Sequence, residues 1–227
     1  KIAEARKVLA ALTGKPLPDD AELAVHQPQK TEQSLAALFS NNRALSTLMF
    51  FQAFFMCLLM VYGLGSWLPK LMTMAGYGFG SSLMFLLFLN IGGIIGAIGG
   101  GWLSDRFHPR PVLMLFFTLA AVSLALLGFK SHVAVLYFLV TVAGATTIGS
   151  QILLYAYVAQ FYPTAIRSTA LGWSSGVGRI GAILGPVLGG ALLAMQLSHQ
   201  MNFLAFVVPG ALAVIAIMLT AGRKEAV

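Results

Sequence analysis

Six long apolar runs constrain this chain more than any other feature. They cover residues 44–68, 81–103, 111–129, 132–161, 169–197 and 201–221, and Arg179 is the one charged residue within them. Each run has at least 19 residues, whereas about 17–25 helical residues cross the hydrocarbon core of a bilayer. The runs lack the alternation of membrane β-strands, so we predict an all-α membrane protein with six transmembrane helices.

The charged residues support this prediction by where they lie. Residues 1–43 hold 11 of the 21 charged residues, and the following 184 residues hold 10. A soluble domain, with about 25% charged residues, cannot be built from so few. The formal net charge of +7 comes from scattered Lys and Arg, which form no basic stripe for phosphates, so we expect no nucleic-acid partner. We predict that residues 1–43 form a cytoplasmic linker and residues 44–227 the bundle in the lipid bilayer.

The connectors between the runs predict the orientation in the membrane. One side carries Arg43, Arg106, Arg110, Arg167, Arg223 and Lys224, and the other carries only Lys70 and Lys130. Because Lys and Arg concentrate in cytoplasmic loops, we predict that both termini of this segment are cytoplasmic.

The six runs divide into two matching triplets. The second and fifth runs each carry three glycines at four-residue spacing: Gly92, Gly96 and Gly100, and Gly181, Gly185 and Gly189. Such series let helix backbones approach closely. Paired triplets are typical of secondary transporters with inverted repeats, so we predict one 3+3 bundle.

Polar side chains lie along one face of the first and fourth runs. These are Gln52 and Tyr62 in the first run, and Gln151 and Tyr155 in the fourth. A carboxamide facing lipid would stay unsatisfied. We therefore predict that these faces line the wall of a cavity.

Arg179 is the residue that most directly indicates function. A charge at mid-span costs at least about 2.5–3.5 kcal/mol to insert, so such residues usually face a cavity and act on an ion or substrate. The helical face of Arg179 is small and partly polar, with Gly172, Ser175, Ala182 and Pro186. We predict that Arg179 binds a substrate anion. The alternative is a structural ion pair with a carboxylate outside the six runs, which contain no acidic residue.

Two motif matches suggest enzymes instead. Residues 172–176 fit the G-x-S-x-G pattern of serine hydrolases, but that chemistry needs a base beside the serine. The four histidines lie in residues 1–43 or at the ends of runs, so an intramembrane serine hydrolase remains only a remote alternative. Gly176, Gly178 and Gly181 fit a dinucleotide motif but follow no strand. We expect no enzyme, no cofactor and no metal site.

Residues 101–110, GWLSDRFHPR, lie between the second and third runs on the predicted cytoplasmic side. They closely resemble the cytoplasmic loop motif of the major facilitator superfamily, a family of twelve-helix transporters. The resemblance implies a conformational switch that one state forms and the other breaks. Its members here would be Gly101, Asp105, Arg106 and Arg110.

A second stretch resembles the aromatic acid:proton symporter family within that superfamily. It comprises residues 162–167, YPTAIR, then Gly172-Trp173, residues 176–182, GVGRIGA, and Gly185-Pro186. This resemblance implies that Arg167 belongs to the same switch. It also implies that residues 1–43 correspond to the central cytoplasmic loop and the six runs to the C-terminal half of the transporter.

The resemblance implies proton-coupled uptake of aromatic carboxylates, of the benzoate or hydroxybenzoate type, across a bacterial inner membrane by alternating access. Arg179 would bind the substrate carboxylate, and six further side chains could contact the ring and its hydroxyl: Gln52, Tyr62, Asn90, Gln151, Tyr155 and Trp173. The family's proton-coupling carboxylate would lie in the missing N-terminal six-helix half. A facilitator for another organic anion or metabolite remains the main alternative.

Overall fold

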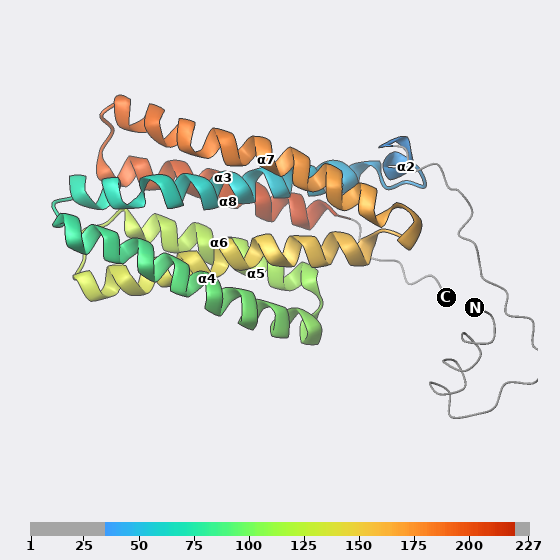
Figure 1. The fold of residues 1–227 in the computed structure, drawn as a ribbon, viewed down its shortest axis with the longest axis horizontal. Coiled ribbons are helices and arrows are strands. Elements are labelled where there is room, and N and C mark those ends of the chain that lie inside the picture. The colour runs from blue at the N-terminus through green and yellow to red at the C-terminus, as the bar shows by residue number, and fades with distance from the viewer. Residues whose placement is uncertain (1–34, 221–227) are drawn as a thin grey trace, which may run out of the picture. The chain divides into compact units, whose positions relative to one another are not determined.

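Figure 1 shows the computed structural model, which describes residues 35–220. Its helices are α2 (Leu35–Phe39), α3 (Ala44–Met74), α4 (Phe79–Phe107), α5 (Pro109–Leu127), α6 (Val133–Phe161), α7 (Thr164–Ala194) and α8 (His199–Leu219). Helices α3 to α8 are long and apolar enough to cross a membrane, and no strand occurs within residues 35–220. The predicted all-α bundle of six helices is confirmed. Most of the predicted linker, residues 1–34, lies outside the described residues.

Several helices extend beyond the apolar runs that predicted them. Helix α3 continues through Pro69 and Lys70 to Met74, and α7 begins at Thr164, directly after Pro163. A run ends where charged or polar residues begin, whereas a helix ends only where its backbone hydrogen bonds stop. As a result, Asp105 and Arg106 lie in the last turns of α4, and Arg167 lies in the first turn of α7.

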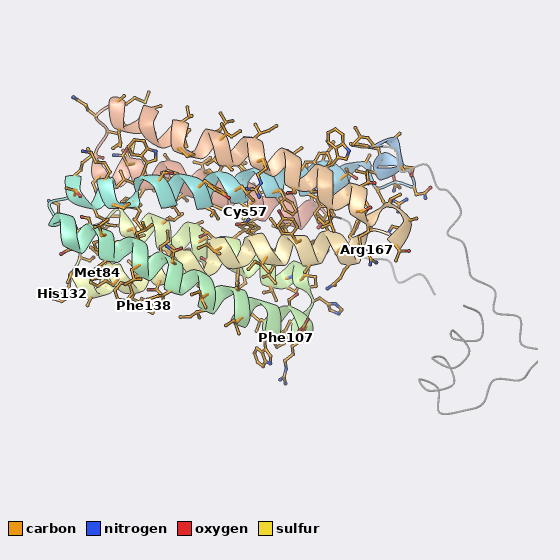
Figure 2. All side chains as sticks on the ribbon, viewed as in Figure 1. Cys57, Met84, Phe107, His132, Phe138 and Arg167 are labelled. Carbon is orange, nitrogen blue, oxygen red and sulfur yellow. The ribbon has the colours of Figure 1, made fainter. Side chains whose placement is uncertain are left out.

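The helices alternate in direction, which gathers the connectors at two ends. Figure 2 shows Arg167 and Phe107 toward one end, Met84 and His132 toward the other, and Cys57 between them. The end with Arg167 also carries the short connector between α4 and α5. Of the basic residues predicted for the cytoplasmic side, the four that the structure describes, Arg43, Arg106, Arg110 and Arg167, therefore lie at one end of the bundle, whereas Arg223 and Lys224 lie outside the described residues.

The two triplets, α3–α5 and α6–α8, pack across each other. Helix α7 packs most extensively on α3, and α4 packs equally closely on α6. Helices α5 and α8 pack on each other and on α6 and α3, respectively. The second helix of each triplet thus lies against the first helix of the other, as expected for a repeated unit.

The glycine series form these two close contacts. A Cβ added at Gly181 or Gly185 of α7 would overlap backbone atoms of α3, and one added at Gly92 or Gly96 of α4 would overlap backbone atoms of α6. Glycine is therefore needed at these positions for backbone-to-backbone contact. The prediction of close helix approach at both series agrees with this packing.

Candidate functional site

Arg179 is the middle residue of α7, with 15 residues of the helix on either side. Its side chain is exposed on the bundle, and its Nη1 donates a hydrogen bond of 3.0 Å to the hydroxyl of Tyr62 on α3. The structure thus brings together two of the predicted substrate-binding residues, 117 positions apart in the sequence. Asp105 is the only acidic residue between residues 44 and 220, and it lies at the end of α4.

The position of Arg179 follows from the glycine contact beside it. Gly178 and Gly181 are buried in α7 and face α3, where an added Cβ would meet Phe54 or Phe55. Because α3 and α7 approach so closely here, the long side chains of Arg179 and Tyr62 meet at the edge of the helix contact. The same packing leaves the guanidinium accessible.

A second polar pair lies one helical turn away on α7. The hydroxyls of Tyr155 on α6 and Ser175 on α7 are 3.0 Å apart, and both side chains are partly buried. The Tyr155 ring also packs edge-on against Phe54, with ring centroids 5.0 Å apart. Residues four apart share one face of a helix, so Ser175 and Arg179 lie on the same side of α7.

The sequence predicts no ligand role for Ser175. Ser175 belongs to the small, partly polar face of α7 that carries Arg179, but a serine within a helix commonly bonds its own backbone. The signal that could have identified Ser175 is its spacing of four residues from the intramembrane arginine.

Asn90 occupies the position on α4 that corresponds to Arg179 on α7. Gly92 contacts Thr141 and Gly96 contacts Ala145, just as Gly181 contacts Phe55 and Gly185 contacts Leu59. Asn90 and Arg179 both stand two residues before the first glycine of their pair. Asn90 is exposed, and its Nδ2 donates to the Leu86 carbonyl of the same helix at 2.8 Å.

The remaining predicted contact residues are spread over the bundle. The amide of Gln52 donates to the Leu212 carbonyl of α8 at 3.4 Å, so it links α3 to α8 rather than joining the Arg179–Tyr62 pair. Gln151 is half-buried on α6, one turn before Tyr155. Trp173 is 48% exposed on α7.

The predicted switch residues do not form one cluster. Asp105 and Arg106 are exposed at the end of α4, where the Arg106 guanidinium carbon lies 5.9 Å from the centre of the Trp102 ring. Gly101, one helical turn earlier, has open space where a Cβ would stand. Arg110 instead donates from Nη2 to the Met218 carbonyl at 2.7 Å, which caps the C-terminal end of α8.

Arg167 lies apart from these residues. It stands in the first turn of α7, and within the described residues α7 makes no contact with α4 or α5. Its side chain is half-buried, and its Nε is buried without a hydrogen-bond partner among the described residues. The geometry therefore separates Arg167 from the segment between Gly101 and Arg110.

The geometry offers no support for the hydrolase alternative. Ser174 is 1% exposed within α7, and the three described histidines, His108, His132 and His199, all stand at helix ends. Within residues 35–220, no group of three or more His, Cys, Asp or Glu side chains could hold a metal ion.

Comparison with known proteins gives a family and several relatives. The family model described as the Major Facilitator Superfamily matches residues 91–226, more than half of the chain. A benzoate transport protein of Acinetobacter baylyi is 50% identical over 187 residues, which are 82% of this chain and 40% of that protein.

Two further relatives have related names. A gentisate transporter of Corynebacterium glutamicum is 48% identical over 154 residues, which are 68% of this chain and 35% of that protein. A 4-hydroxybenzoate transporter of Pseudomonas aeruginosa is 37% identical over 221 residues, which are 94% of this chain and 48% of that protein. The chain thus spans less than half the length of each of these three relatives.

Proposed function

The chain belongs to the Major Facilitator Superfamily, and from this we propose that it forms one six-helix half of a membrane transporter for aromatic carboxylates. The superfamily is one of transporters, so the chain is not an enzyme. Relatives named for benzoate, gentisate and 4-hydroxybenzoate support the substrate class. In this proposal the chain is the C-terminal half, and an N-terminal six-helix half completes the substrate site.

The observation that carries this proposal is the exposed guanidinium of Arg179 at the middle of α7. Such a charge is costly in a membrane and usually acts on an ion or substrate. A guanidinium has five N–H donors, and the bond to Tyr62 is the one that Arg179 forms within the described residues. The others suit bidentate binding of a carboxylate.

Transport would proceed by alternating access, with two bundles rocking about a site near the bilayer midplane. We propose uptake across a bacterial inner membrane with both termini of this segment in the cytoplasm. The basic residues gathered at one end of the bundle support this orientation. Proton coupling would need a titratable carboxylate in the other half, since Asp105, at the end of α4, is the only acidic residue between residues 44 and 220.

The test is uptake of labelled benzoate and 4-hydroxybenzoate by cells that express the protein at its natural full length. Arg179→Ala should abolish uptake of both compounds while the protein still reaches the membrane. Lys70→Ala removes an exposed cation at the far end of α3 and should leave uptake unchanged. Normal uptake by Arg179→Ala would contradict the site, and no uptake of any aromatic acid by the inserted wild type would contradict the substrate class.

A further inference from the structure

Tyr62 and Arg179 are bonded although their backbones lie at different levels of the contact between α3 and α7. Glycines farther along α7 meet residues farther along α3, so the two helices run parallel. Gly185 of α7 meets Gly63 of α3, the residue after Tyr62. Gly185 stands six residues after Arg179, which is a rise of about 9 Å along the helix axis. The backbone of Tyr62 therefore lies well beyond that of Arg179.

The Arg179 side chain consequently extends against its usual direction. Side chains on a helix lean toward its N-terminus, which for α7 is the end that carries Arg167. The bond of 3.0 Å to the Tyr62 hydroxyl instead holds the guanidinium toward the C-terminal part of α7, on the side away from Ser175. Within the described residues, this is the bond that keeps the guanidinium there.

The segment of α3 that carries Tyr62 is itself fixed on α7. The backbones of Gly63 and Gly185 are in contact. About one turn after Tyr62, the indole nitrogen of Trp67 donates to the Pro186 carbonyl at 2.7 Å. The hydroxyl that holds the guanidinium thus belongs to a rigid part of the contact between the two helices.

The bond leaves the guanidinium free to bind a carboxylate. The Tyr62 hydroxyl accepts from Nη1 of Arg179, so the edge formed by Nε and Nη2 keeps two N–H groups for a bidentate contact. A side chain that is already held loses less freedom when a ligand binds, and this preorganisation raises affinity. A fixed guanidinium also fixes the place of the bound carboxylate.

We propose that Tyr62 is a positioning residue rather than a contact for the ring: it fixes the Arg179 guanidinium, so that the site selects acids by the distance between carboxylate and ring. The proposal rests on the proposed binding of the substrate carboxylate by Arg179. A fixed guanidinium suits one spacing, and in a benzoate the carboxylate is attached directly to the ring. In phenylacetate a methylene separates the two, so carboxylate and ring cannot both occupy their places.

The test measures uptake of labelled benzoate by the natural full-length protein, with unlabelled benzoate and phenylacetate as competitors. The wild type should favour benzoate. Tyr62→Phe keeps the ring and removes the acceptor oxygen, so KM for benzoate should rise about three- to ten-fold. The maximal rate should change less than about two-fold. The potency of phenylacetate should also change less than about two-fold, because a guanidinium released from Tyr62 can follow its carboxylate.

The matched control is Tyr77→Phe. The Tyr77 hydroxyl donates to the Ser131 carbonyl at 3.3 Å, between the connectors at the other end of the bundle. Its loss removes the same group from the protein without touching the contact between α3 and α7. This variant should keep the wild-type KM and the wild-type preference for benzoate.

Three results would overturn the positioning role. Equal weakening of benzoate and phenylacetate by Tyr62→Phe would show that the hydroxyl bonds the carboxylate itself, since both acids carry that group. An unchanged KM would show that the bond to Arg179 has no influence on binding, whether or not the maximal rate and Tm fall. A wild type that binds the two acids equally would show that the guanidinium does not select by spacing.

Failure of the positioning role and failure of the transport function give different results. If Arg179→Ala abolishes uptake while Tyr62→Phe behaves as the wild type, the positioning role alone fails. If Arg179→Ala takes up benzoate normally, or if the inserted wild type takes up no aromatic acid, the proposed function itself fails.

Discussion

Gly181→Ala tests whether the close contact between α3 and α7 positions the substrate site. The added Cβ would overlap the carbonyl oxygen of Phe55 and lie 2.9 Å from its carbonyl carbon. Carbon atoms in contact prefer separations of about 3.5–4.0 Å, and a backbone group cannot rotate away. The two helices must therefore separate by roughly 0.5–1 Å, which forfeits about a quarter to a half of the dispersion energy across the gap.

The expected cost is that of overpacking, about 1–3 kcal/mol. For a chain of this size each kcal/mol lowers Tm by about 2–4 °C, so Tm in detergent should fall by between about 2 and 12 °C. Arg179 stands two residues from Gly181 and bonds Tyr62 across the same contact. The variant that still folds should therefore show a raised KM for aromatic acid uptake.

Gly176→Ala provides the matched control on the same helix. A Cβ at Gly176 meets nothing within 4 Å, and alanine favours a helix over glycine by about 1 kcal/mol. Its Tm should stay equal or rise, with unchanged uptake. Equal Tm values for the two alanine variants would refute the view that the glycine contact holds α7 and the site in place.

Two further predictions separate the roles of the switch residues. Arg110→Ala should lower Tm through the loss of about 1–2 kcal/mol, because Arg110 caps the C-terminal end of α8 at the Met218 carbonyl; an unchanged Tm would contradict this role. Asp105→Asn should lower the maximal rate of uptake more than substrate affinity and leave Tm unchanged, since Asp105 is exposed; a normal rate at normal expression would remove it from the switch.

The six helices could be predicted from the sequence because the bilayer imposes a length and a composition that few soluble segments share. Their ends were harder to predict. The ends of an apolar run mark where the chain leaves the hydrocarbon core of the membrane. Helices α3 and α4 continue beyond the ends of their runs into charged turns, and α7 begins in a charged turn before its run starts. For this reason Arg167 lies within a helix, although the apolar run began two residues later.

Arg179 could be identified from the sequence because an isolated charge within a span stands out by its energetic cost alone. The roles of neutral polar residues depend on which helix lies opposite. Their spacing predicts that Gln52 and Tyr62 share one face of α3, yet the amide of Gln52 bonds α8 while Tyr62 bonds Arg179. The contact between Tyr155 and Ser175 cannot be predicted from the sequence, because no local pattern reveals that α6 meets α7 there.

The repeated packing explains why a single arginine can define the site. The glycine contacts place Asn90 of α4 and Arg179 of α7 at corresponding positions in the two triplets. The repeat thus supplies two similar positions, and only one carries a charge. Asn90 is a neutral amide, so Arg179 is the one of the two positions that can pair with the charge of a carboxylate. Replacing Asn90 with a second arginine would make the two positions alike and should weaken binding of monocarboxylates, because the second cation would remain unpaired in the membrane.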